Sequence, residues 1–250
     1  MRFASCYSGI GGSDAGLCGA GWELAWQAEA DAFRRAVLAR RFGRPVHERV
    51  ETLPEAPEIV ATDLLYAGLP DHRLDRWWPP LWRVAQRLVP RWLVCEFSPT
   101  VRVEPVLREL VAGGWAFRIV FARTALRLGA EGAWDVRNNA LLLASSDAAA
   151  IDGLGLASML VALTIEGEPS CVPAGTVERA EAERGLREGW TCACHADGGP
   201  GCACNRAARL SAVNDATPPY LTAWLAELVD GRWTDGRGTD RGAPTTSEAL

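Results

Sequence analysis

Apolar and polar residues alternate along the first part of the chain with two periods, one typical of strands and the other typical of amphipathic helices. Short apolar segments predict strands at residues 2–6, 23–29, 58–70 (ending near Gly68), 91–97, 115–122 and 138–145. Longer segments with helical spacing predict helices that begin near Ser13 and that cover residues 31–43, 79–90 and 103–114. Because strands alternate with helices of about three turns, the pattern predicts an α/β fold with a mostly parallel, doubly wound sheet.

Residues with known preferences for helix ends support these boundaries. Ser13 can cap the first helix with its hydroxyl. Gly43 follows the second helical segment, at the position where glycine commonly ends a helix. Pro79 is expected in the first turn of the helix over 79–90, because proline is tolerated where the backbone N–H has no partner within the helix.

The pattern changes after residue 147, and it divides the chain into four parts. These parts are a core over residues 1–147, a small lobe over 148–206, a closing segment over 207–229 that returns to the core, and a tail over 230–250. The lobe contains a predicted strand at 158–167 and a charged segment at 175–190 that reads as a helix, and a closing helix covers 217–229. The tail is polar and rich in glycine, so we expect it to be disordered.

A glycine-rich turn, YSGIGG at Tyr7–Gly12, lies between the first strand and the first helix. Gly9, Gly11 and Gly12 allow the backbone to approach a ligand closely, and the start of the helix offers free N–H groups. The glycines alone fit a tight turn without a ligand equally well. Glu29, at the end of the second strand, favours a ligand, because a carboxylate there can accept both hydroxyls of a ribose.

At these residues the sequence resembles the DNA cytosine-5 methyltransferases. The first motif of that family, F-S-G-x-G-G, is matched by Tyr7–Gly12, and the typical A-G-W follows at residues 20–22. The acidic residues of the second motif are matched by Glu29 and Asp31. The resemblance implies a Rossmann-like methyltransferase core.

Later segments continue the resemblance in the order of the family. Glu96 stands at the acidic position of the motif E-N-V, and Asn214 matches the Asn of the last motif, G-N-A-V-P-P. The resemblance covers about residues 1–146 and 207–229, and it places the 148–206 lobe where the family carries its target-recognition domain.

The cofactor that this resemblance implies is S-adenosylmethionine (SAM). The residues that would hold it are Tyr7, Gly9, Gly11, Gly12, Glu29 and Asn214. For the residue that binds the adenine amino group in the family, Glu48 and Glu51 both remain open.

The nucleophile of the family is missing at its expected position. Family members activate cytosine by adding a thiolate from a P-C-Q motif to C6 of the base. Here Pro70 is followed by Asp71 at the Cys position and by His72 at the Gln position. A carboxylate is a far weaker nucleophile than a thiolate in this addition, and the loop that follows is shortened to a few residues before Trp77.

Two further motifs of the site are only partly retained. The acid of E-N-V survives as Glu96, but Phe97 and Ser98 replace the Asn and Val. The Q-x-R-x-R motif aligns with Asp135, Arg137 and Asn139, so that one of its three characteristic residues remains. The catalytic residues that the resemblance leaves are therefore Glu96 and Arg137.

Cys95, at the end of the strand over 91–97, is the candidate for a displaced nucleophile. Ligands bind at the carboxyl ends of parallel strands, which favours this residue. Its setting in the apolar run WLVCEF favours instead a small buried hydrophobic side chain, and we expect this second role.

A cluster of cysteines, CACHADGGPGCAC, lies in the small lobe. Two C-x-C pairs around a glycine-rich turn can place four thiolates about one zinc ion, and a small lobe with little core benefits from a structural metal. The expected ligands are Cys192, Cys194, Cys202 and Cys204, with His195 as a further candidate. Unliganded thiols and a redox pair are the alternatives.

Composition adds little to the choice of partner. The chain is 48% hydrophobic and 23% charged and has a net charge of −5, so it carries no overall positive charge for nucleic acid. DNA is the partner that the resemblance implies, and a protein partner remains open. No apolar run reaches about 18 residues and the start lacks an export signal, so we expect a cytoplasmic protein without a membrane segment.

The sequence therefore predicts a SAM-binding homologue of DNA cytosine-5 methyltransferases that is catalytically impaired or inactive, and that serves as a DNA-binding or regulatory subunit. One alternative is an active DNA cytosine-5 methyltransferase with a displaced or partner-supplied nucleophile. A second alternative is a zinc-stabilised adaptor that has lost SAM binding.

Overall fold

A twisted sheet organises the chain in the computed structural model, which describes residues 1–70, 73–128, 134–154, 160–167, 181, 186, 190–192 and 206–232. The strands are β1 (Arg2–Cys6), β2 (Glu23–Ala28), β3 (Val46–His47), β4 (Leu64–Gly68), β5 (Trp92–Phe97), β6 (Ala116–Leu128), β7 (Trp134–Ser145) and β8 (Leu160–Gly167). The described helices are α1 (Gly12–Gly19), α2 (Ala32–Phe42), the 3-10 helix η1 (Val50–Glu55), α3 (Leu74–Leu88), α4 (Glu104–Ala112), α5 (Ala148–Asp152), α7 (Arg206–Asn214) and α8 (Pro219–Val229). Within this part of the chain, no helix has the length and apolar character that crossing a membrane requires.

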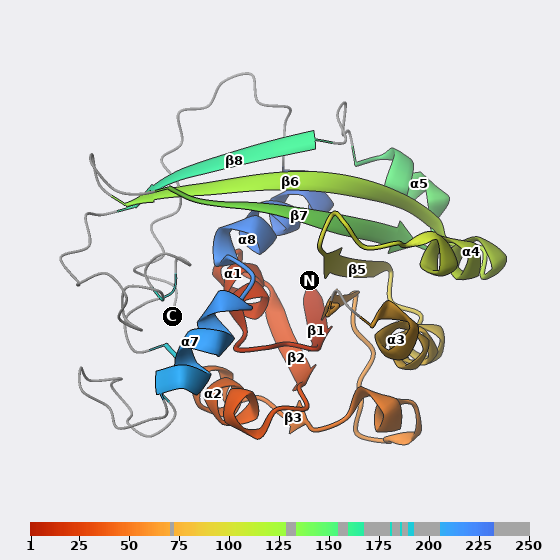
Figure 1. The fold of residues 1–250 in the computed structure, drawn as a ribbon. Helices are drawn as coiled ribbons and strands as arrows, with labels where there is room; N and C mark the ends of the chain where they lie inside the picture. Colours follow the sequence, from red (N-terminus) through yellow and green to blue (C-terminus); the bar gives the residue numbers. More distant parts are fainter. Residues whose placement is uncertain are drawn as a thin grey trace.

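The strands pair in the order β3-β2-β1-β4-β5-β7-β6-β8 (Figure 1). The five strands from β3 to β5 are parallel, whereas β7 lies antiparallel between β5 and β6. β8 then pairs with β6 in parallel, so part of the segment assigned to the small lobe extends the sheet of the core. The prediction of a doubly wound, mostly parallel α/β sheet is confirmed.

Each face of the sheet is covered by its own set of helices. Side chains alternate along a strand, so neighbouring residues enter opposite layers. On β4, Leu65 joins the apolar layer beneath α3 and α4, whereas Leu64 and Tyr66 join the layer beneath α1, α5 and α8. Both layers are contiguous and largely excluded from water, which gives the sheet two apolar cores.

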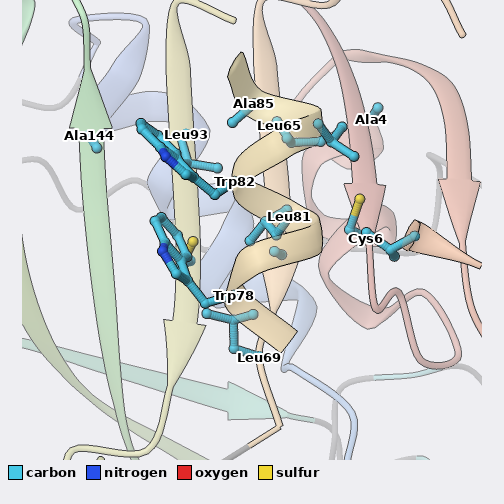
Figure 2. Packing of buried hydrophobic residues seen from close by; sticks show 14 of the residues in the cluster. Ala4, Cys6, Leu65, Leu69, Trp78, Leu81, Trp82, Ala85, Leu93 and Ala144 are labelled. Carbon is cyan, nitrogen blue, oxygen red and sulfur yellow. The ribbon is translucent and has the colours of Figure 1, made fainter. Parts of the chain in front are cut away.

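The helix α3 begins five residues before the predicted helix. Pro79 and Pro80 lie inside it, after Leu74, so the expected place of Pro79 in the first turn is wrong. Trp78 and Trp82 stack with ring centroids 5.5 Å apart, and both are buried in the apolar layer that includes Leu69, Leu93 and Ala144 (Figure 2). The burial of two indoles offsets the cost of about 3 kcal/mol that proline imposes within a helix.

The closing segment contains two helices rather than one. α7 ends at Asn214, and α8 begins at Pro219, because Pro218 and Pro219 disfavour helical backbone in the residue before each of them. α8 then packs directly on α1 (Figure 1). This approach requires glycine, since a Cβ atom on Gly16 would lie 1.9 Å from the carbonyl oxygen of Pro219.

Candidate functional site

The turn after β1 has the backbone conformation that its glycines allow. Gly9 and Gly11 have positive φ angles of 60° and 80°, and Tyr7 also has a positive φ of 55°. The turn is tied to the sheet by the amide of Ser8, which donates to the carbonyl of Ala28 at 3.1 Å. Among the residues that the structure describes, none beyond its chain neighbours has an atom within 4 Å of a Cβ atom placed on Gly9, so this glycine borders open space in the described part. That space lies at the carboxyl ends of parallel strands, where α/β folds bind ligands.

Glu29 lies beside this turn, as the sequence predicts. Its Oε2 accepts a hydrogen bond from the amide of Gly9 at 2.8 Å, and its Oε1 accepts one from the amide of Asp31 at 2.9 Å. Glu29 as a whole is buried, with 8% of its surface exposed. Because each carboxylate oxygen has two acceptor positions, both oxygens keep capacity for a further donor such as a hydroxyl.

Gly11 and Gly12 face protein rather than open space. A Cβ atom on Gly11 would lie 2.4 Å from the ring of Phe42, and one on Gly12 would lie 2.1 Å from the carbonyl oxygen of Thr217. These two glycines are therefore required for the packing of the turn against α2 and against the segment before α8. Of the three glycines expected at a cofactor, Gly9 is the one that the structure leaves open to a ligand.

Tyr7 is held by the start of α3. Its hydroxyl donates to the carbonyl of Trp77 at 2.8 Å, and the two rings meet edge to face at 5.4 Å. Burial, followed by Cys6 and Glu51, raises the pKa of Tyr7 well above its ordinary value. The phenol is therefore neutral and can serve as a packing surface.

The two candidates for the adenine contact lie in different settings. Glu48 follows β3, is largely exposed and lies 3.7 Å from the guanidinium of Arg35. Glu51 lies in the first turn of η1 and is close enough to Tyr7 to raise the pKa of that phenol. Of the two, Glu51 is therefore the one whose charge acts on Tyr7, the first residue of the glycine turn.

Glu96 stands at the centre of a group of polar side chains from four segments, which we call the Glu96 cluster: Tyr66, Glu96, Asn139 and Thr217. Glu96 Oε2 accepts hydrogen bonds from the hydroxyl of Tyr66, at 2.5 Å, and from the hydroxyl of Thr217. Glu96 Oε1 accepts one from the amide of Asn139. Burial and then the nearby Glu96 carboxylate raise the pKa of Tyr66 well above its usual range, so Tyr66 acts as a donor.

Other predicted site residues fall partly or wholly outside the described residues. Arg137 lies on β7 opposite Thr124, and Asn214 is the last residue of α7, but their side chains are outside the described part. Asp71 and His72, at the position of the missing nucleophile, lie outside it entirely. Their roles therefore stay predictions.

Cys95 is a buried member of the apolar layer beneath α3 and α4. Burial raises the pKa of its thiol well above the ordinary value. A thiolate is the nucleophilic form of cysteine, so this environment opposes the chemistry of a displaced nucleophile. The expectation that Cys95 is a small hydrophobic core residue is confirmed.

Only one of the four expected zinc ligands lies in the described part. Cys192 is buried, and its carbonyl oxygen accepts a hydrogen bond from Arg40 at 2.9 Å. Cys194, Cys202, Cys204 and His195 are outside that part. Among the residues described, no group of three or more His, Cys, Asp or Glu side chains is arranged to hold a metal, so zinc stays a prediction.

The sequence did not predict how the lobe meets the glycine turn. Trp190 Nε1 donates to the carbonyl of Ile10 at 2.8 Å, and the guanidinium of Arg41 lies over the Trp190 ring at 5.2 Å. Beside it, Glu181 accepts hydrogen bonds from both the amide and the hydroxyl of Thr191 and lies 3.5 Å from Arg209. No spacing in the sequence could have linked residues this far apart.

Asp14, in the first turn of α1, is a second group that sequence analysis missed. It is fully buried, and its carboxylate accepts a hydrogen bond from Gln27 at 2.6 Å. Burial raises the pKa of Asp14 to about 6, although hydrogen bonds from Gln27 and Ser5 lower it in part. The glycine turn is thus followed directly by a carboxyl group that titrates near neutral pH.

Comparison with known proteins supports the fold. No protein-family model and no curated protein matches the chain. Among solved structures, it is similar to Schizosaccharomyces pombe Dnmt2 methyltransferase, with a TM-score of 0.62 and 11% identity over 93% of this chain and 99% of that one. It is also similar to a Spodoptera frugiperda DNMT2 mutant, with a TM-score of 0.60 and 8% identity over 92% and 99%.

A third structure agrees with these two. The Entamoeba histolytica methyltransferase EhMeth matches with a TM-score of 0.57 and 8% identity, over 94% of this chain and 99% of that one. Identities this low establish the fold and no more. The chain therefore has the Rossmann-like fold of SAM-dependent methyltransferases.

Proposed function

We propose that this chain is a SAM-binding homologue of DNA cytosine-5 methyltransferases that has no effective nucleophile of its own, and that acts as a DNA-binding or regulatory subunit. The observation that carries the proposal is the pairing of Glu29 with the amide of Gly9, beside the open space that Gly9 borders. A carboxylate and a free backbone surface are thus presented together at the carboxyl ends of β1 and β2.

The residues around that space fit the cofactor. The open acceptor positions of Glu29 suit the two hydroxyls of a ribose, and the glycine backbone admits the amino-acid end of the ligand. Tyr7 supplies an aromatic wall, and Asn214 is proposed to contact the ligand from the end of α7. When bound, SAM supplies an electrophilic methyl group, and the role of these side chains is to bind and orient it.

Two observations support the loss of catalysis. Asp71 replaces the thiol that would add to C6 of cytosine, and a carboxylate performs this addition poorly. Cys95, the candidate for a displaced thiol, is buried in an environment that raises its pKa. DNA is proposed as the partner because of the sequence resemblance, and a protein partner would account for the retention of the fold without its chemistry.

Calorimetric titration with SAM tests the cofactor site. The wild-type chain is expected to bind SAM, and Glu29→Gln is expected to raise the Kd about tenfold or more, because the amide cannot accept hydrogen bonds at both terminal atoms. Glu23→Gln is the matched control, since Glu23 lies at the other end of β2 and is exposed. If the wild-type chain shows no binding, the adaptor that has lost SAM binding is the better assignment.

Methyl transfer is the second test. Incubation with labelled SAM and cytosine-rich DNA is expected to give no incorporation, and DNA that carries fluorocytosine is expected to form no covalent adduct. Incorporation that disappears in Cys95→Ser would contradict the proposal and identify the chain as an active enzyme with a displaced nucleophile. Incorporation only after a second protein is added would identify a partner-supplied nucleophile.

A further inference from the structure

Thr217 joins the end of β5 to the glycine turn. Its hydroxyl donates to Glu96 Oε2, and its carbonyl oxygen occupies the place that a Cβ atom on Gly12 would need, 2.1 Å away. Pro218 and Pro219 follow immediately and restrict the backbone at this point. The position of Thr217 is therefore set on one side by Glu96, and it sets the position of Gly12 on the other.

The carboxylate of Glu96 is already engaged by its neighbours. A carboxylate has about four acceptor positions, and donors from Tyr66, Asn139 and Thr217 occupy three of them. Tyr66 is 1% exposed, so its hydroxyl would lose its acceptor inside the protein if Glu96 turned away. A substrate group that binds Glu96 would therefore share this carboxylate with three donors that already belong to the protein.

We infer that Glu96 is a positioning residue of the cofactor site rather than an acid that contacts a base. By fixing Thr217, it fixes Gly12 and with it the turn that carries Gly9. Asn139 contributes to this role from β7. It stands where the Q-x-R-x-R motif has its last Arg, and its shorter, uncharged amide side chain donates a hydrogen bond to the Glu96 carboxylate. The inference has two tests. The affinity for SAM rests on the proposed function, whereas the hydrogen exchange of the glycine turn does not depend on it.

The decisive experiment compares Glu96→Gln, Thr217→Val and the double variant in the full chain. Each single variant is expected to raise the Kd for SAM about five- to tenfold, because each loses a hydrogen bond to a charged group that holds the turn. The double variant is expected to equal the weaker-binding single variant rather than to multiply the two effects, since both remove the same link. Hydrogen exchange of the amides of residues 8–12 is expected to accelerate in all three.

Conservative and distant substitutions give the controls. Thr217→Ser keeps the hydroxyl and is expected to show wild-type affinity and exchange, so it separates the loss of the hydrogen bond from the loss of the methyl group in Thr217→Val. Thr100→Val removes an exposed hydroxyl shortly after β5 and is expected to change neither readout.

The two readouts also distinguish this inference from the proposed function. If the wild-type chain does not bind SAM, the proposed function fails, and exchange at residues 8–12 still decides the role of Glu96. If Glu96→Gln and Thr217→Val match Thr100→Val in both affinity and exchange, Glu96 does not position the turn and the inference is wrong.

Discussion

The two halves of the candidate site use their carboxylates differently. In the half formed by β1 and β2, Glu29 accepts hydrogen bonds from two backbone amides and borders the open space at Gly9. In the half formed by β4, β5 and β7, Glu96 accepts hydrogen bonds from three side chains of the same chain. These belong to Tyr66, Asn139 and Thr217. The first carboxylate keeps capacity for a ligand, and the second is largely satisfied by its own chain.

This difference shows that a residue which matches a catalytic motif can have a structural role. Glu96 matches the acid of a catalytic motif, yet its described contacts join β4, β5, β7 and the segment before α8. Replacing such a residue would leave buried donors without acceptors, which costs folding free energy whether or not catalysis is retained. A match to a motif at one position is thus weak support for activity when the neighbouring positions of the motif do not match.

The largest effect is expected from removing the buried ion pair between Glu181 of the lobe and Arg209 of α7. Glu181 and Arg209 are almost completely buried, and Glu181 also holds Thr191, next to the Trp190 that donates to Ile10. Arg209→Met is expected to lower the free energy of unfolding by about 3–5 kcal/mol, because it leaves a buried carboxylate without its cation. Urea denaturation measures this change.

The matched control is Arg44→Met, which removes an exposed guanidinium 3.8 Å from Glu23 and is expected to cost less than about 1 kcal/mol. Hydrogen exchange in Arg209→Met is expected to rise more at residues 8–12 than in β5, since Thr191, which Glu181 holds, is next to Trp190, and Trp190 donates to Ile10. Equal stability of the two variants would show that the lobe does not support the half formed by β1 and β2.

A smaller effect, dependent on pH, is expected from Asp14, which lies in the half formed by β1 and β2. Its folded pKa, about 6, is higher than the ordinary 3.8, so the folded chain favours the protonated form. The stability that this group contributes is therefore fully present below about pH 4 and is lost as pH rises through about 6.

Asp14→Asn imitates the protonated form at every pH. Its stability relative to wild type is expected to grow by about 2–3 kcal/mol between pH 4 and pH 7.5, as measured by urea denaturation at both values. The comparison with wild type cancels the titration of other groups. A constant difference between the two proteins would mean that Asp14 stays charged when folded.

The smallest effect is expected at the joint between α1 and α8, which both halves share. Gly16→Ala is expected to destabilise the chain by about 1–3 kcal/mol, because the added methyl group meets the carbonyl oxygen of Pro219 and the hydroxyl of Thr222. In Gly19→Ala, on the same helix, the methyl group meets nothing within 4 Å, and this control is expected to be neutral or slightly stabilising. Thermal melting of both variants makes the comparison, and similar melting temperatures would show that α8 can move away from α1.

Local patterns predicted most of the elements, and long-range packing explains where they failed. Short continuous apolar runs located the strands at 2–6 and 91–97, because each of these strands buries side chains on both faces of the sheet. The same reasoning misplaced the start of α3, since Pro79 looks like a first-turn residue until the stacking of Trp78 on Trp82 is known. The two-residue strand β3 is visible only through its pairing with β2.

In the candidate site, too, local patterns predicted some contacts and missed the long-range ones. Gly9 and Glu29 could be predicted because a turn after one strand and an acid after the next must meet at the same sheet edge. Thr217 and Glu96 are 121 positions apart, and Trp190 and Ile10 are 180 apart, so no local pattern connects them. The sequence analysis did not single out Asp14, whose carboxylate is buried against Gln27 of β2, a contact that no local pattern predicts.

The placement of α8 has a consequence for how the protein is made. One apolar layer of the sheet, which includes Tyr66 of β4 and Trp92 of β5, is covered by Leu221, Trp224 and Leu225. A ribosome delivers those covering residues more than 120 positions after the strands, so during most of synthesis this layer has only α1 and later α5 to cover it. The nascent polypeptide should therefore complete its folding only after residue 229 has left the exit tunnel, and until then it presents a surface that chaperones bind.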